Sequence, residues 1–336
     1  MAGICGLAYA VGWVIRHNIR HAEPLLAANP PEATLAFERG SDLALVLAYV
    51  VSVSLYLHIM SAFVLGGIGL DTRLNENLVA TATIAIIVVI GGICGLKKLE
   101  ALEQWGLYIT LLIILLLLGG FAKYTLAAAG SATGLILPKA GTASAWETVT
   151  VLAGTLIVVQ GFETTRYLGK VYDAQTRISA SRWAQILATV VYIVFVGLAL
   201  PVVYNLHGQY DDNSLIQLAA FAAGILVIPL VVAAALSQFS AAVADTLAAA
   251  GNLEEVTHQH FKEKYAYLWI GGAAIALTWS ADTYQLLAIA SRSFAFYYLL
   301  QCLVGISVSK SRVQQCCMAV VAAVLGFITI FAVPVG

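Results

Sequence analysis

The chain has 336 residues, of which 61% are apolar and only 10% are charged, whereas soluble domains are about 25% charged. Together with a mean hydropathy of +0.89, this composition excludes a soluble enzyme, a disordered chain and a nucleic-acid-binding protein. The 17 basic and 18 acidic residues give a net charge of −1, so the total charge indicates no partner. We therefore expect an all-α, polytopic membrane protein surrounded by membrane lipid.

A helix needs about 20 residues to cross the hydrocarbon core of a bilayer, and ten apolar segments approach or exceed that length. In chain order, we expect these spans at 1–22, 42–68, 77–97, 103–128, 146–168, 181–205, 214–248, 265–280, 283–308 and 313–334. Residues 1–336 then form a single membrane domain.

Basic residues in the loops indicate the orientation of the spans. If the first span runs inward, thirteen Lys and Arg residues lie on the cytoplasmic side: Arg16, Arg20, Arg39, Lys97, Lys98, Arg166, Lys170, Arg177, Arg182, Lys262, Lys264, Lys310 and Arg312. Only Arg73, Lys123 and Lys139 lie on the other side. Because cytoplasmic loops are enriched in Lys and Arg, we expect both termini outside. The first span begins at Met1 without a basic flank, which indicates that a preceding helix is absent from the chain.

The second and third spans carry polar and small residues near their middles. Tyr56 and His58 lie in the second span, where a lone histidine is more often a hydrogen-bond donor to a neighbouring helix than a ligand. The third span contains Gly91-Gly92-Ile93-Cys94-Gly95. Its spacing of small residues favours close helix packing.

The fifth span is interrupted by polar residues. Its apolar stretch, 148–162, is short for a crossing and ends in Gln160-Gly161-Phe162-Glu163. Gly161 permits unusual backbone angles, and Glu163 follows where the span should still be in the membrane. Either the helix is broken there and offers free backbone groups to a substrate, or the span ends at Gly161 and Glu163 is interfacial.

The seventh span carries a candidate ion site. Ser237 and Ser240 are three residues apart and share a helix face, and Asp245 lies near the same face. Hydroxyl and carboxylate oxygens suit Na⁺ or a proton relay. Alternatively, the serines bond back to their own helix and Asp245 lies at the cytoplasmic boundary. Pro229 is expected to kink this span.

The ninth span contains an arginine, Arg292, well inside the expected bilayer. A charge at this depth should face the protein interior and pair with Glu163, Asp245 or a substrate carboxylate; a structural ion pair is the alternative. No nucleophile, phosphate-loop or metal motif is present. We therefore expect no enzyme, no metal and no organic cofactor.

Three stretches resemble a known family. Val159-Gln160-Gly161-Phe162-Glu163 is similar to the G-F-E stretch in the broken sixth helix of the amino acid–polyamine–organocation (APC) permease superfamily. The following loop, Tyr172-Asp173-Ala174-Gln175-Thr176-Arg177-Ile178, resembles that family's N-P-x-R-x-I/V-P run, although both prolines and the Asn are missing. Residues 91–103 also look like the loop that joins the family's fourth and fifth helices.

The resemblance implies a leucine-transporter-type (LeuT) 5+5 inverted repeat. The ten spans then correspond to the family's second through eleventh helices, so its first core helix is missing. Residues 1–128 are the remainder of the first repeat, 146–308 are the second repeat, and 313–334 are an extra C-terminal helix. Sodium-coupled members bind Na⁺ through the first and eighth helices, and Ser237 and Ser240 lie on the latter.

We accordingly expect an N-terminally truncated secondary transporter for an amino acid or organic amine, coupled to Na⁺ or H⁺, in the plasma membrane (the inner membrane of a bacterium). The expected substrate-binding residues are Gln160, Gly161, Phe162, Glu163, Tyr56 and Arg292. The expected ion-binding residues are Ser237, Ser240 and Asp245. The alternative is a non-transporting membrane sensor or assembly subunit that retains the permease fold.

Overall fold

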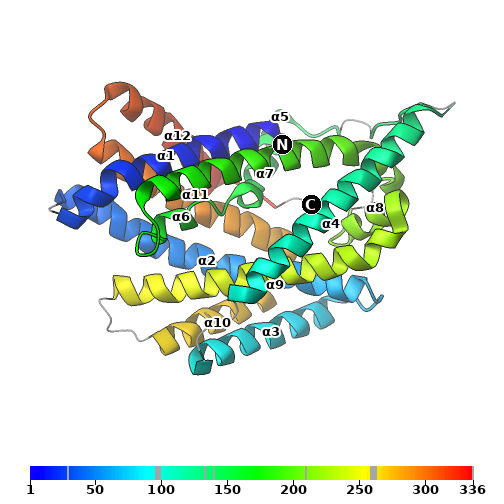
Figure 1. Cartoon of the computed structure of the whole chain (residues 1–336), viewed down its shortest axis with the longest axis horizontal. Helices are drawn as coiled ribbons and strands as arrows, with labels where there is room; N and C mark the ends of the chain where they lie inside the picture. The colour runs from blue at the N-terminus through cyan, green and yellow to red at the C-terminus, as the bar shows by residue number, and fades with distance from the viewer. Residues whose placement is uncertain are drawn as a thin grey trace. The chain divides into compact units, whose positions relative to one another are not determined.

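The computed structural model describes residues 1–28, 30–94, 100–131, 134–138, 141–208, 210–257 and 263–334. These residues form helices and connecting turns, and each of the ten expected segments contains helix, although those at 146–168 and 214–248 are interrupted (Figure 1). Lys97, Lys98, Lys139 and Lys262, which entered the orientation argument, lie outside the described residues.

Within the described residues, seven helical segments are long and apolar enough to cross a membrane: Glu32–Gly66, Arg73–Ile93, Trp105–Ala129, Ala174–Leu206, Ser214–Val256, Thr283–Val308 and Arg312–Phe331. Many large apolar side chains on these helices are exposed, as a lipid-facing surface requires. Leu115 and Leu187 are examples, at 64% and 60% exposure. The chain is therefore an integral, multi-pass membrane protein.

The chain divides into two compact units. Unit 1 comprises Met1–Ala48, Ala143–Ile193 and Leu287–Gly336, and unit 2 comprises Tyr49–Thr142 and Val194–Leu286. The helices α2 (Glu32–Gly66), α7 (Ala174–Val203) and α11 (Thr283–Val308) contribute residues to both units.

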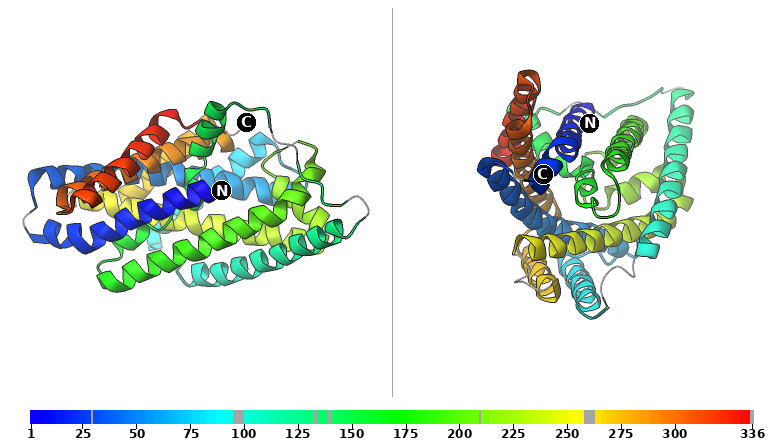
Figure 2. Two further views of the ribbon diagram at one scale, coloured as in Figure 1. Left: turned by 90° about the horizontal axis from the view of Figure 1, so that it is seen from above. Right: turned by 60° about the vertical axis from the view of Figure 1, so that its left-hand side comes forward.

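Unit 1 is built around an interrupted segment. The remaining elements of this unit are α1 (Ala2–Ala28), α5 (Ala145–Ala153), the 3-10 turn η2 (Leu156–Val159), α6 (Thr164–Tyr167) and α12 (Arg312–Phe331). α1 packs against η2 and α12, and α12 packs against α5. α1 and the first part of α7 run side by side (Figure 2). The chain thus places η2 and α6 next to two long helices.

Unit 2 packs long helices closely. Its remaining elements are α3 (Arg73–Cys94), α4 (Glu100–Ala129), η3 (Tyr204–Leu206), α8 (Ser214–Ala223), η4 (Gly224–Leu226), α9 (Val227–Val256) and α10 (Glu263–Ser280). Gly91 of α3 meets the ring of Tyr267 on α10, since a Cβ at Gly91 would lie 3.2 Å from that ring. Gly91 therefore serves helix packing, whereas Gly92 meets nothing within 4 Å and Gly95 lies outside the described residues.

The segment expected as one span at 214–248 is interrupted. α8 ends at Ala223, and η4 separates it from α9. Pro229 is the third residue of α9, where its missing N–H costs no hydrogen bond because the first turn of a helix has no partners for its N–H groups. Pro229 therefore lies in the first turn of a new helix. The expectation that it kinks a continuous helix was wrong.

Candidate functional site

The break in the fifth segment begins with a short, well-capped helix. The hydroxyl of Ser144 accepts a hydrogen bond from the N–H of Glu147 (3.2 Å), and the Glu147 carboxylate accepts one from the N–H of Ser144 (2.8 Å). This capping box fixes the start of α5. The helix stops at Ala153, and Gly154 abuts the carbonyl oxygen of Val333, which would lie 2.2 Å from a Cβ.

A serine on α11 replaces the hydrogen bonds that the broken helix lacks. Ser291 donates to the carbonyl oxygen of Gly154 (2.7 Å) and accepts from the N–H of Ile157 (3.1 Å). Its side chain is fully buried. Because an unpaired backbone group at membrane depth costs several kcal/mol, this hydroxyl stabilises the interruption.

Gly161 forms the turn itself. Its φ is +113°, a region that residues with a side chain rarely adopt. Its N–H donates to Oε2 of Glu163 (2.9 Å), and its carbonyl accepts from the hydroxyl of Thr164 (2.8 Å). The expectation of a broken helix at Gly161 is met: the backbone leaves η2 at Gln160 and re-enters a helix at Thr164.

Glu163 turns toward α11. The hydroxyl of Tyr298 donates to Oε2 of Glu163 (2.7 Å), and the rings of Phe162 and Tyr298 stack at 5.5 Å between centroids. The carboxylate is fully buried. Within the described residues, its second oxygen, Oε1, has no hydrogen-bond partner. A proton or a cation would satisfy this oxygen.

A cavity of about 270 Å³ lies on the other side of the break. Val159, Gln160, Gly161 and Phe162 form one wall. The other walls are Thr164 and Thr165 of α6, Cys5, Ala8 and Tyr9 of α1, and Ala180, Ser181, Ala184, Gln185, Ala188, Thr189 and Tyr192 of α7. The volume is close to the lower end of the ligand-pocket range, about 300 Å³.

The structure brings three of the expected substrate residues, Gln160, Gly161 and Phe162, to this cavity. Glu163 lies behind them, against Tyr298. Arg292 belongs to the same unit, but its guanidinium Nε donates to the carbonyl oxygen of Ala332 (2.7 Å).

The other expected site residues belong to unit 2. Tyr56 is half-buried on α2, and Ser237 and Ser240 are half-buried on α9. Asp245, which is buried, accepts a hydrogen bond from the hydroxyl of Ser52 on α2. His58 bonds through Nε2 to the carbonyl of Thr278 on α10 (3.2 Å), which is the helix-to-helix contact expected of it.

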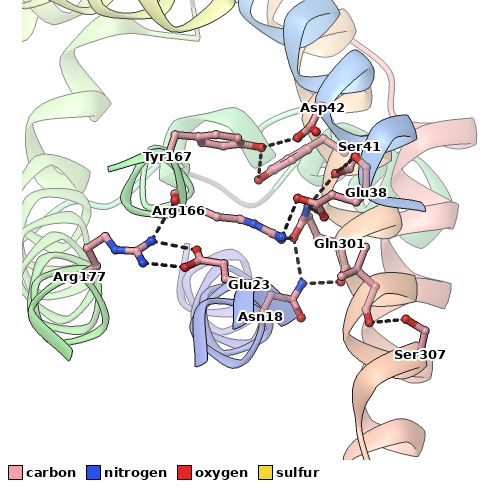
Figure 3. A network of polar contacts seen from close by, with 12 residues as sticks. Asn18, Glu23, Glu38, Ser41, Asp42, Arg166, Tyr167, Arg177, Gln301 and Ser307 are labelled. Carbon is pink, nitrogen blue, oxygen red and sulfur yellow. Dashed lines mark hydrogen bonds and ion pairs between the residues drawn. The ribbon is translucent and has the colours of Figure 1, made fainter. Parts of the chain in front are cut away.

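A buried polar network follows the break and was not expected from the sequence (Figure 3). Arg166 pairs with Glu38 of α2 (2.6 Å) and also donates to the side chain of Gln301 on α11. Gln301 in turn donates to Ser41 (2.7 Å), and Asn18 donates to Gln301 (2.9 Å). The network ties α6 to α1, α2 and α11.

A second ion pair joins the start of α7 to α1. Arg177 and Glu23 form a two-pronged contact at 2.6 and 2.9 Å (Figure 3). Arg166 and Arg177 were expected to be cations of cytoplasmic loops, yet both are buried. Gln301 is a polar residue in the middle of an apolar span. Its position could have indicated that a polar residue of a neighbouring helix contacts it.

A multi-pass helical protein with a broken helix beside a cavity has the architecture typical of a secondary transporter. Comparison with known families is consistent with this class, since a family described as "APC superfamily transporter" matches residues 1–336. A relative from Aquifex aeolicus (strain VF5), described as an uncharacterized protein, is 35% identical over 342 residues, which cover 98% of this chain and 82% of the relative. The chain belongs to the APC superfamily of transporters.

Proposed function

We propose that the protein is a secondary active transporter of amino acids or related organic amines, coupled to Na⁺ or H⁺, in the plasma membrane. The observation that carries this proposal is the break at Gly161 beside the cavity of unit 1. We keep the ten spans and the LeuT-type 5+5 repeat as part of the proposal.

The substrate site is proposed at the wall formed by Gln160, Gly161 and Phe162. An unwound backbone presents carbonyl oxygens that an intact helix would use internally, and these oxygens suit the ammonium of an amino acid. Phe162 covers an apolar part of the ligand. Tyr56 and Arg292 remain proposed contributors.

Two sites are proposed for the coupling ion. Glu163 offers a buried carboxylate with one oxygen that has no partner among the described residues, which suits a proton. Ser237, Ser240 and Asp245 on α9 offer hard oxygen atoms, which suit Na⁺. Dependence of uptake on the sodium gradient or on the proton gradient distinguishes them.

The test is to reconstitute the chain in liposomes and measure binding and uptake of a panel of radiolabelled amino acids and amines. Gradients of Na⁺ and H⁺ are imposed separately. We expect saturable uptake of at least one compound that collapses when the driving gradient is removed. Saturable binding without gradient-driven uptake supports the non-transporting sensor instead, and absence of both binding and uptake contradicts the proposal.

A further inference from the structure

The guanidinium of Arg16 is buried behind the cavity wall that α1 and α7 form. Arg16 of α1 is only 6% exposed. It donates hydrogen bonds to the side chains of Gln185 and Ser181 and to the carbonyl oxygen of Tyr9, and its guanidinium carbon lies 5.0 Å from the centre of the Tyr9 ring. All three partners line the cavity.

These partners of Arg16 are neutral. Within the described parts of unit 1, no carboxylate pairs with this guanidinium, whereas Arg166 and Arg177 pair with Glu38 and Glu23. A second cation, Arg182, also lies close enough to act on Arg16. Because a buried charge is costly without an opposite charge, this end of the cavity has an uncompensated positive potential.

The hydrogen bonds also orient donors toward the cavity wall. The Gln185 amide uses its oxygen to accept from Arg16 and one N–H to donate to the carbonyl oxygen of Ala8 (2.8 Å). Its second N–H is therefore available to a ligand. The Ser181 oxygen accepts from Arg16 (3.4 Å), which leaves its O–H to donate.

Gly12 leaves room for the Gln185 amide in this position. A Cβ at Gly12 would lie 2.1 Å from the amide oxygen of Gln185. The amide is the far end of a flexible side chain, so an alanine at position 12 would displace it without breaking the helix packing. The change Gly12→Ala thus moves the donor of Gln185 without removing any polar side chain from the chain.

We propose that this end of the cavity binds an anionic group, a carboxylate, of the transported ligand. Gln185 and Ser181 contact the carboxylate, and Arg16 is a positioning residue that polarises both donors and supplies the positive potential. This inference rests on the proposed function and narrows its substrate class. It selects ligands that carry a carboxylate and excludes simple amines.

The test compares matched ligands on the full chain in lipid nanodiscs. A tritiated amino acid that binds saturably is displaced by its unlabelled free acid, by its primary amide and by the amine that remains after decarboxylation. We expect the acid to compete at least about tenfold more strongly than the amide or the amine, since a charge-assisted hydrogen bond to a carboxylate is lost in both.

Three variants separate the proposal from a structural role. Arg16→Gln should weaken acid binding by about tenfold or more and leave amide binding unchanged, so that discrimination is lost. Gly12→Ala should reduce the same discrimination. Arg20→Gln, which removes an exposed cation one turn further along α1, is the matched control and should bind as the wild type does.

Several results would overturn the inference. If the amide or amine competes as well as the acid, or if both Arg16→Gln and Gly12→Ala retain full discrimination, the carboxylate site is wrong while saturable uptake still supports a transporter. If Arg16→Gln does not purify as a monodisperse species, the discrimination between acid and amide in Gly12→Ala is the test of the inference. Absence of saturable binding and uptake for every compound overturns this inference and the proposed function together.

Discussion

Gly161 has the unusual backbone conformation that the break in the helix requires. Its φ of +113° is accessible to glycine, and a Cβ there would meet nothing within 4 Å. The cost of a side chain at this position therefore comes from the backbone conformation and not from a clash.

We predict that Gly161→Ala lowers the stability of the protein by about 1–3 kcal/mol and weakens ligand binding, because the turn relaxes toward a conformation that alanine tolerates. Thermal unfolding in detergent and ligand binding measure the two effects. Gly197→Ala on α7 is the control, since a Cβ there also meets nothing and the φ there is ordinary. Unchanged unfolding and binding in Gly161→Ala would remove Gly161 from the site.

Glu163 is the residue on which proton coupling depends in our proposal. We predict that Glu163→Gln abolishes the stimulation of uptake by an inward proton gradient, because glutamine fills the same space beside Tyr298 but cannot release a proton. Uptake at a series of external pH values measures this effect. Glu147→Gln, an exposed change in the same segment, should leave the pH profile as it is; a profile unchanged in Glu163→Gln would assign the carboxylate a structural role.

At the scale of the element, the broken helix depends on a neighbouring helix for its hydrogen bonds. We predict that Ser291→Ala destabilises the protein by about 1–3 kcal/mol, because it leaves the N–H of Ile157 and the carbonyl of Gly154 without a partner. Denaturation in detergent measures the difference. Ser293→Ala is the matched control, since the Ser293 hydroxyl bonds back to the Ile289 carbonyl of its own helix; equal effects of the two changes would contradict the assignment.

The start of α7 is stabilised in a pH-dependent manner. Asp173 accepts hydrogen bonds from the N–H of Thr176 (3.0 Å) and from its hydroxyl (2.6 Å), which lower the pKa of Asp173 below its usual value of 3.8. A carboxylate whose pKa is lower in the folded state adds stability above its unfolded pKa, and this stability is lost as the pH falls through the folded pKa.

We therefore predict that the stability difference between the wild type and Asp173→Ala is full at neutral pH and shrinks as the pH falls below about 4. Hydrogen exchange in the first turn of α7 over a pH series reports it. Asp173→Ser, which keeps a hydrogen-bond acceptor without a titrating group, should remove the pH dependence. A difference that is constant from pH 7 to pH 3 would be inconsistent with this role.

The sequence predicts the helical elements but not the residues that each element contacts. The helical segments and the break at Gly161 follow from local properties, namely runs of apolar residues and one glycine before a carboxylate. The partners do not follow, because Arg166 meets Glu38 across 128 positions and Asp245 meets Ser52 across 193. Ser291 was part of a polar run in the sequence, yet only the fold shows that it, and not Arg292, bonds to the broken helix.

At the scale of the whole molecule, the distribution of basic residues predicts the topology. We predict that single cysteines at positions 97, 170 and 262, introduced after the five native cysteines are replaced, are protected from an impermeant reagent in sealed cells. A cysteine at position 73 should be labelled, because Arg73 lies on the side with few basic residues. Labelling at two of the three positions that we expect to be protected would contradict the proposed topology.

The last residues that the structure describes are attached to the broken helix. The N–H of Val333 donates to the carbonyl of Thr150 (3.1 Å), Gly154 abuts the carbonyl of Val333, and the carbonyl of Ala332 accepts from Arg292. Ala332 and Val333 thus form a strap across α5. An affinity tag or fluorescent protein fused directly after these residues would pull on the break itself, so probes for transport measurements are better carried on the exposed loop at Lys170.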